Sequence, residues 1–335
     1  MQKGFDDFIK KTLKIRWNST LPKKGIALVK IFLKPLLFRF KLKKKYLPLS
    51  NLHPMKPILA LFAFLCPLFL SAQTVCSLES RQLLDKELEN LASETAKNQS
   101  IQEWVVEIGR DFLGTPYVEK TLEIPGPEQL VINLQGVDCT TFLEAVVTLA
   151  RMTEMQDLSF EQFEKELEKL RYRSGKNEGY PSRLHYFTEW IVANQKKGII
   201  QDITAEIGGS PYPNSPSFMS ENPQFYPQLS EPANLAKIRE AETQISQYAY
   251  SFIPKEKIQS LEKGIQSGDL IAITTPMANL DVVHVGFAVW QNGRVHLLHA
   301  SSKNKEVEIS ALPLHDYLAG NKGQSGIMVA RLTGN

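Results

Sequence analysis

Residues 284–301 of the chain read HVGFAVWQNGRVHLLHAS. Asn292-Gly293 is a preferred two-residue hairpin turn, so the strands on either side of it should be direct neighbours. The residues before and after the turn are mostly apolar, with the valine and aromatic content that is typical of strands. We therefore expect residues 284–290 and 295–300 to form adjacent antiparallel strands.

Counting outward from this turn brings two histidines together. Gly286 falls opposite His299, and His284 falls opposite Ser301. His284 and His299 therefore project from one face of the sheet, one diagonal step apart, where long side chains can meet. His296 falls on the other face and is excluded from the pair.

The rest of the chain has helical patterns first and strand patterns last. Helices followed by an antiparallel sheet make an α+β arrangement. Residues 209–235 hold many of the prolines, and we expect them to form an irregular surface excursion. The expected helices are 77–98, 101–113, 138–151, 160–172 and 184–197, and the other expected strands are 269–274 and 327–332.

Cys139 stands at the start of one of these helices, in the sequence DCTT (138–141). The N-terminus of a helix stabilises a thiolate, so we expect a lowered pKa for Cys139 and a nucleophile there, although an inert buried cysteine is the alternative. With His284 and His299 on a facing sheet, the three residues predict a nucleophile, its base and a group that orients the base. A metal site of the same residues would lack a fourth ligand and the close spacing of zinc motifs, so we expect no metal.

The composition excludes several classes of protein. Of 335 residues, 43% are hydrophobic and 22% are charged, which excludes a disordered or fibrous chain. Three cysteines are too few for a disulfide scaffold. The net charge of +3 combines two unlike parts, because residues 1–54 hold 14 Lys or Arg and two acids, whereas the chain from residue 73 holds 24 basic and 34 acidic residues. The acidic part indicates no nucleic-acid partner.

Residues 55–72 have the layout of a secretory signal peptide. Met55-Lys56-Pro57 precedes an apolar run over 58–70, and Ser71-Ala72-Gln73 offers small residues for cleavage near Ala72. The run is shorter than the roughly 20 residues of a membrane-spanning helix. We expect a secreted, periplasmic protein with no membrane span in its mature form, and a signal anchor is the alternative.

The basic leader, residues 1–54, has no role in the expected fold. We expect translation to start at Met55, which leaves the leader untranslated. The alternative is a cytoplasmic basic tail that binds anionic lipid or nucleic acid through charge. In either case residues 73–335 are expected to form a single domain.

Five short segments occur in order along that domain: GTPY (114–117), DC (138–139), GDL (268–270), HVG (284–286) and HASS (299–302). Together they resemble the NlpC/p60 cell-wall cysteine peptidases, whose fold is papain-like. Three further segments, VDCTTF (137–142), SRLHY (182–186) and LDV (280–282), resemble the N-acetylmuramoyl-L-alanine amidase-like branch of that superfamily. The resemblance covers residues 104–331.

The resemblance implies Cys139 as nucleophile, His284 as general base and His299 as the residue that orients His284, with Tyr117 lining the substrate groove. Most NlpC/p60 members have Asp-Cys-Ser-Gly where this chain has DCTT, and the difference agrees with the amidase-like branch. The implied reaction cleaves the amide between N-acetylmuramic acid and L-alanine in peptidoglycan fragments (muropeptides) through a thioester, without metal or cofactor. The alternatives are a γ-D-glutamyl-diaminopimelate endopeptidase, an inactive muropeptide-binding module and a thiol acyltransferase.

The substrate's carboxylates require local cations in an acidic enzyme. Arg183 is the candidate for substrate binding, and a solvated arginine at a helix end is its alternative. Asp138 can cap its helix, contact substrate, or do both. We expect His185 to be structural and Asp281 to be a turn residue. The region 173–250 exceeds a minimal papain-like core, and we expect it to wall the groove.

Overall fold

The computed structural model of the chain describes residues 74–94, 99–155 and 157–334. The predicted leader (1–54) and signal peptide (55–72) lie outside these residues. Within the described ranges, no helix has the length and apolar character needed to cross a bilayer.

The hairpin predicted around the Asn-Gly turn is formed by β7 (Val282–Gln291) and β8 (Arg294–Ser301). The two turn residues have φ angles of 50° and 77°, the positive values that a type I′ turn requires. The ladder keeps the predicted register from the turn as far as the Phe287–Leu298 pair. This part of the hairpin prediction is confirmed.

The two strands belong to an eight-stranded sheet of the described residues, in the order β4-β5-β10-β6-β7-β8-β9, with β3 also paired to β10. The neighbouring strands are antiparallel. The predicted strands before and after the hairpin are β6 (Leu270–Thr274) and β10 (Gly326–Leu332). The strands that the sequence did not predict are β3 (Ile200–Asp202), β4 (Ser210–Pro211), β5 (Ser251–Pro254), β9 (Glu306–Ile309) and a separate parallel pair, β1 (Thr74–Cys76) and β2 (Leu130–Ile132).

Each predicted helix is present, and most ends differ by a few residues from the prediction. Residues 95–98, where the first helix was predicted to end, lie outside the described residues. The helix predicted from residue 184 begins only at Phe187, because Leu184 instead donates its backbone N–H to the carbonyl of Arg171. The matching helices are α4 (Leu78–Glu94), α5 (Ile101–Asp111), α6 (Cys139–Met152), α7 (Phe160–Arg171) and α8 (Phe187–Lys196). The helices that were not predicted are α9 (Thr204–Ile207), α10 (Phe218–Glu221), α11 (Pro232–Ile245), α12 (Ile258–Leu261) and α13 (Leu314–Ala319).

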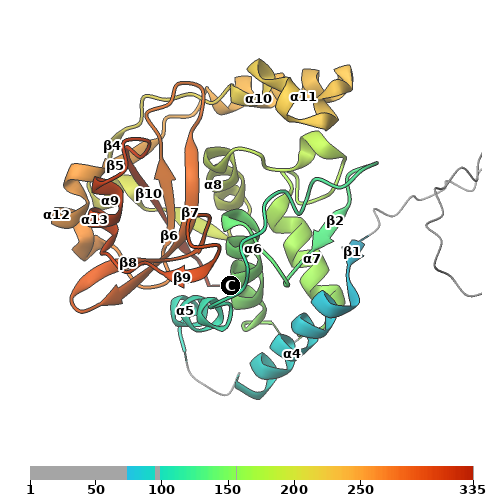
Figure 1. Ribbon diagram of the computed structural model, residues 1–335, viewed down its shortest axis with the longest axis horizontal. Coiled ribbons are helices and arrows are strands. Elements are labelled where there is room, and N and C mark those ends of the chain that lie inside the picture. The colour runs from blue at the N-terminus through green and yellow to red at the C-terminus, as the bar shows by residue number, and fades with distance from the viewer. Residues whose placement is uncertain (1–73, 95–98, 156, 335) are drawn as a thin grey trace, which may run out of the picture. The chain divides into compact units, whose positions relative to one another are not determined.

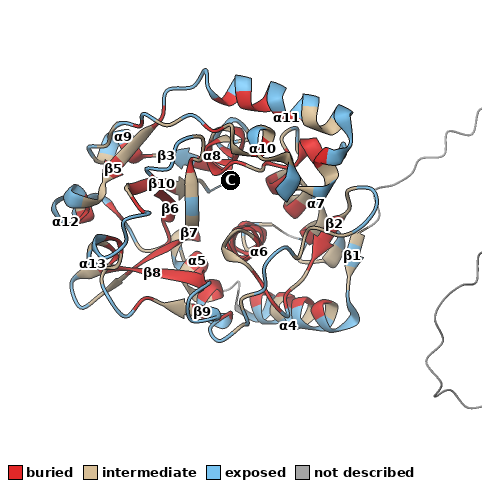
Figure 2. Ribbon diagram, turned by 45° about the horizontal axis from the view of Figure 1, so that its top comes forward, coloured by how far each residue is buried: buried red, intermediate tan, exposed pale blue. Residues whose placement is uncertain are grey.

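The sheet has a hydrophobic core on each face. Along β7, Val285 and Phe287 belong to the core shared with α5 and α6, whereas Ala288 belongs to the core on the opposite face, shared with α13. Figure 1 shows α5 and α6 on one side of the sheet and α12 and α13 on the other. Figure 2 shows the buried strands between these helices, with exposed faces on α4 and α11. The α+β arrangement of helices on an antiparallel sheet is therefore present.

A buried ion pair fixes the orientation of α6. The carboxylate of Glu144 accepts from Nε of Arg171 on α7 at 2.7 Å and from Nε1 of Trp190 on α8 at 3.3 Å. Arg171 also donates to the carbonyl of Val131 at 2.7 Å. Breaking a buried pair leaves an uncompensated charge, so these contacts hold α6 firmly against α7 and α8. The first residue of α6, Cys139, is positioned by this packing.

Candidate active site

The start of α6 is closed by a reciprocal capping box. Oδ1 of Asp138 accepts from the backbone N–H of Thr141 at 2.8 Å, and the Thr141 hydroxyl accepts from the N–H of Asp138 at 2.9 Å. This bonding confirms Asp138 as the cap, and its predicted contact with substrate stays a prediction. It also gives the second threonine of DCTT a role that glycine could not fill. Cys139 occupies the first helical position, where backbone N–H groups are free of intrahelical bonds.

The two histidines meet, as the count from the turn predicted, but β7 and β8 are not paired at these residues as that count required. Nε2 of His284 lies 2.6 Å from Nδ1 of His299, and the two rings are nearly perpendicular, at 89°. The predicted pairs Gly286–His299 and His284–Ser301 are not part of the ladder, which stops at Phe287–Leu298. The regular pairing ends before these residues, although the two strands stay close to each other.

One local feature accompanies the end of the pairing. A bulge interrupts the pairing of β7 with β6, because Ile273 pairs with His284 whereas the next residue of β6 pairs with Val282. A bulge bends its strand and redirects the neighbouring side chains. The first residue of α6, Cys139, lines the same pocket as residues 282–285 of β7.

Gly286 lets β7 cross close to β8 at this point. A Cβ atom at this position would lie 2.6 Å from the backbone carbonyl oxygen of Leu298 and 2.9 Å from Cβ of His299. Both distances are shorter than side chains tolerate. The short distance between the two histidines therefore depends on glycine at position 286.

Cys139 and His284 line the same pocket, which has a volume of about 190 Å³. The region 173–250 contributes residues 184–187, Met219 and Tyr226 to its wall, as the sequence predicted. The other lining residues are Thr140 and residues 280–285.

The protonation states of the pocket differ from the sequence prediction. Burial, with a smaller contribution from the charge of Asp138, raises the pKa of Cys139 to about 11, whereas the helix start predicted a lowered value. Burial lowers the pKa of His284 to about 4. Burial and the neighbouring His284 lower the pKa of His299 to about 3. At neutral pH the site therefore holds a neutral thiol and two neutral imidazoles.

Tyr117 lies near Cys139. Burial raises the pKa of its hydroxyl, and the charges of Cys139 and Asp138 add to the rise, which places those groups nearby. Its ring also lies under Nζ of Lys305, 5.3 Å from the ring centroid. The role of Tyr117 in the groove stays a prediction.

Arg183 does not have the surroundings expected of a substrate-binding cation. Its side chain is buried, and it forms ion pairs with Glu123 and, at 3.6 Å, with Glu128. Its guanidinium lies over the ring of Tyr180, 5.0 Å from the centroid. The guanidinium is already paired and does not line the pocket, and the solvated alternative is wrong as well. Its neighbour His185 is held structurally, as expected, by a 2.9 Å bond between Nε2 and the carbonyl of Tyr180.

Asp281 is much more than a turn residue. Its side chain is 2% exposed, and Oδ2 accepts from both the backbone N–H and the hydroxyl of Thr188, each at 2.8 Å. Thr188 lies in the first turn of α8, so Asp281 caps that helix from a distant part of the chain. These bonds join the residues before β7 to the start of α8, and both segments line the pocket.

A second set of hydrogen bonds joins α10 and α11 to Tyr186 in the pocket wall. The hydroxyl of Tyr186 donates to Oε1 of Glu242 on α11 at 2.7 Å and accepts from the backbone N–H of Met219 at 2.8 Å. Glu242 also accepts from the backbone N–H of Ser220 at 3.0 Å. No local sequence pattern indicates either set of hydrogen bonds, because the partners lie far apart along the chain.

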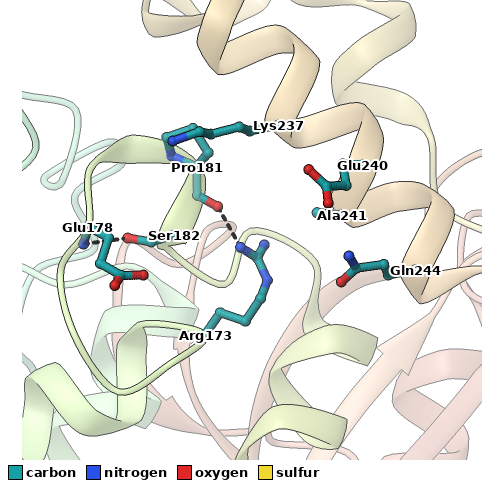
Figure 3. A pocket seen from close by; sticks show the side chains of 8 residues that line it. All are labelled: Arg173, Glu178, Pro181, Ser182, Lys237, Glu240, Ala241 and Gln244. Atoms are coloured by element: carbon teal, nitrogen blue, oxygen red, sulfur yellow. Dashed lines mark hydrogen bonds between the residues drawn. The ribbon is translucent and has the colours of Figure 1, made fainter.

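A separate cavity of about 210 Å³ lies between α11 and the loop that carries Arg173 and Pro181 (Figure 3). The guanidinium of Arg173 is bound to the carbonyl of Pro181 at 2.9 Å and to the carboxylate of Glu189. Lys237 and Glu240 of α11 line the cavity with opposite charges. The described residues that line it include no cysteine or histidine.

No group of three or more His, Cys, Asp or Glu residues with the geometry of a metal site occurs in the described part of the chain. His284 and His299 are instead hydrogen-bonded to each other.

Comparisons with known proteins point to one family. A family model named AmiA-like, for N-acetylmuramoyl-L-alanine amidase-like proteins, matches residues 107–327. None of the curated proteins matches the chain. Among solved structures, an N-acetylmuramoyl-L-alanine amidase from Bacteroides uniformis is similar, with 39% identity and a TM-score of 0.66 over 70% of this chain and 99% of that one.

Two further structures are similar. A Bacteroides fragilis protein, provisionally named a xylanase, has 37% identity and a TM-score of 0.64 over 67% of this chain and 99% of its own. A Legionella pneumophila protein has 23% identity and a TM-score of 0.57 over 75% of this chain and 95% of its own, which supports the fold alone. The family match spans every residue that lines the pocket. The chain therefore belongs to the AmiA-like family of N-acetylmuramoyl-L-alanine amidase-like proteins.

Proposed function

We propose that the protein is a cysteine amidase that hydrolyses the amide between N-acetylmuramic acid and L-alanine in muropeptides. The observation that carries the proposal is a cysteine at a helix start and a bonded histidine pair that meet at one pocket. The name of the Bacteroides uniformis relative supports the choice of amide. The same constellation favours the papain-like, NlpC/p60 class for the single domain 73–335.

The proton positions follow from the histidine contact. Nε2 of His284 is engaged with His299, so Nδ1 is the nitrogen left to act on Cys139. As the sulfur attacks the amide carbonyl, His284 takes the thiol proton and delivers it to the leaving nitrogen. The peptide departs with a free amino group on L-alanine, and the sugar's lactyl group remains as a thioester. His284 then takes a proton from water, which hydrolyses the thioester and restores the thiol.

Because the thiol of Cys139 and the imidazole of His284 are neutral before the reaction, charges form on them only during it. With a thiol pKa of about 11 and a His284 pKa of about 4, the thiolate and imidazolium form only as the carbonyl is attacked. The free N–H groups at the start of α6 are suited to receive the developing oxyanion. We propose that Met219 and Tyr226 narrow substrate choice from the opposite wall.

The provisional xylanase name of the Bacteroides fragilis relative does not suit this pocket. Glycoside hydrolysis uses two carboxyl groups that flank the scissile bond. The carboxylate among the pocket's lining residues is Asp281, which is buried and bonded to Thr188. A cysteine and histidine pair favours acyl transfer instead.

Mass spectrometry of defined muropeptides tests the proposal. The wild-type protein should release a peptide that begins with L-alanine and a sugar with a free lactyl acid. Cys139→Ala should release neither, whereas Cys76→Ala, which removes the other free cysteine of the described residues, should behave like the wild type. A product cut after γ-D-glutamate would favour the endopeptidase, and full hydrolysis by Cys139→Ala would overturn the mechanism. Binding without hydrolysis by the wild type would favour the inactive module.

We also propose export to the periplasm after cleavage near Ala72, on the sequence pattern of residues 55–72. N-terminal sequencing of protein from the native host should give residue 73 first. Recovery of any peptide from residues 1–54 would contradict a start at Met55.

A further inference from the structure

One nitrogen of the histidine pair is left without a hydrogen bond. Nε2 of His299 is fully buried and has no hydrogen-bond partner among the described residues. Buried polar atoms are nearly always satisfied, so an unsatisfied one in an active site requires an explanation. A carboxylate oxygen, Oε1 of Glu308, lies 3.6 Å away.

The fold holds Glu308 in this place. His299 of β8 and Glu308 of β9 are directly paired across the ladder. Nδ2 of Asn304 donates to both carboxylate oxygens of Glu308, at 2.8 and 2.7 Å. Asn304 is itself fixed, because its backbone N–H donates to the hydroxyl of Ser301 at 3.1 Å. The turn between β8 and β9 therefore aims the carboxylate at His299.

The positions of the hydrogens along the pair are linked. A neutral imidazole carries one N–H, so His284 can accept the thiol proton at Nδ1 only if its own hydrogen is on Nε2. That hydrogen is donated to Nδ1 of His299, because the two atoms are 2.6 Å apart. His299 must then carry its hydrogen on Nε2, the atom that faces Glu308.

We propose that Glu308 is a positioning residue that accepts this hydrogen and thereby fixes the reactive tautomer of His284. The proposal rests on the proposed roles of Cys139 and His284. Without Glu308, His299 could carry its hydrogen on Nδ1 and donate it to His284. His284 would then hold its own hydrogen on Nδ1 and could not take the proton of Cys139.

The other groups that face His299 do not replace Glu308. His284 of β7 already occupies Nδ1. Tyr317 of α13 contacts the imidazole with its ring, edge to face, at 5.6 Å between centroids. The 3.6 Å gap to Glu308 is longer than a hydrogen bond, and catalytic hydrogen bonds often tighten only when substrate is bound.

The test compares Glu308→Ala with Glu306→Ala on the full protein with a defined muropeptide. Glu306 lies on the same strand, two residues away, and is exposed. Glu308→Ala should lower kcat about 10–100-fold and leave KM near the wild-type value. Glu308→Gln, which keeps an acceptor, should recover part of the loss, and Asn304→Ala should show a smaller loss in the same direction. Glu306→Ala should match the wild type.

Nitrogen-15 NMR of the imidazoles separates positioning from a structural role. In the wild type His299 should carry its hydrogen on Nε2, and in Glu308→Ala the Nδ1–H tautomer should appear. An unchanged tautomer, or a kcat for Glu308→Ala within twofold of the control, would overturn the proposal. If Glu308→Ala does not fold, the same criteria apply to Glu308→Leu, which also removes the acceptor. Activity retained by Cys139→Ala would refute the proposed function instead, so the two failures are distinguishable.

Discussion

Replacing Asp281 with alanine should destabilise the protein and loosen the pocket together. The change removes the acceptor of two 2.8 Å hydrogen bonds from Thr188, which is 0% exposed. A buried donor left without a partner costs about 1–3 kcal/mol, and two are left here. Burial raises the pKa of Asp281, which means that the carboxylate itself is costly to bury, so its removal returns part of the loss. We expect a net loss of about 2–4 kcal/mol in the free energy of unfolding.

Urea unfolding followed by circular dichroism measures this loss directly. Asp281→Asn keeps one acceptor oxygen and should cost less, about 1–2 kcal/mol. Asp157→Ala is the matched control, because Asp157 accepts a backbone N–H from Ser159 at 3.0 Å near the start of α7 but is exposed. The control should change stability by less than about 1 kcal/mol. The folded Asp281→Ala protein should also show a raised KM, because the bond joins two walls of the pocket.

A double-mutant cycle with Thr188→Val tests the assigned cause. If the hydroxyl bond contributes as described, the combined loss will be smaller than the sum of the two single losses. Strict additivity would show that Asp281 and Thr188 do not act on each other. A loss below about 0.5 kcal/mol for Asp281→Ala would refute the reasoning from burial, since that is the range of ordinary surface changes.

Three further predictions concern other parts of the site. The pKa values of His284 and His299 are depressed in the fold, so the stability that their neutral forms provide is full above about pH 6.5 and falls as the pH drops toward 4. Melting temperatures measured from pH 7 to pH 4 should therefore decline. A flat profile would contradict the neutral pair. Arg183→Ala should lower the free energy of unfolding by about 3–5 kcal/mol, because it leaves the carboxylates of its ion pairs without a partner. The KM for muropeptide should change little. A large rise in KM at unchanged stability would restore the substrate-binding role. Gly286→Ala should lower kcat and change KM less, because the added Cβ would force β8 and His299 away. A wild-type kcat in steady-state assays would show that the close approach of the two strands is not needed.

The sequence predicted those features that depend on local patterns. The Asn-Gly turn set the register of β7 and β8, and the DCTT segment placed Cys139 at a helix start. The end of the pairing between the two strands near His284 was not predictable, because it coincides with a bulge between β7 and β6, and the turn sequence carries no signal for that bulge. The pKa of Cys139 was predicted in the wrong direction, because a helix start indicates local charge but not burial.

The remaining differences come from partners that are distant in the chain. The partners of Arg183 include Glu123, 60 residues earlier, and no local pattern links them. Asp281 bonds to a residue 93 positions away, and it looked like a turn residue because it precedes a strand. Strand β9, which carries Glu308, was not predicted, because four residues are too few for the alternation of charged and apolar side chains to indicate a strand.

The raised pKa of Cys139 has a consequence for the chemical durability of the protein. Oxidants and disulfides react with thiolates much faster than with thiols. Burial also raises the pKa of Cys76, the other free cysteine of the described residues. Both sulfurs are therefore poor targets for peroxide and for mixed-disulfide formation at neutral pH. In the proposed mechanism the thiolate of Cys139 forms only while an amide is being attacked, which should protect the sulfur from oxidants between turnovers.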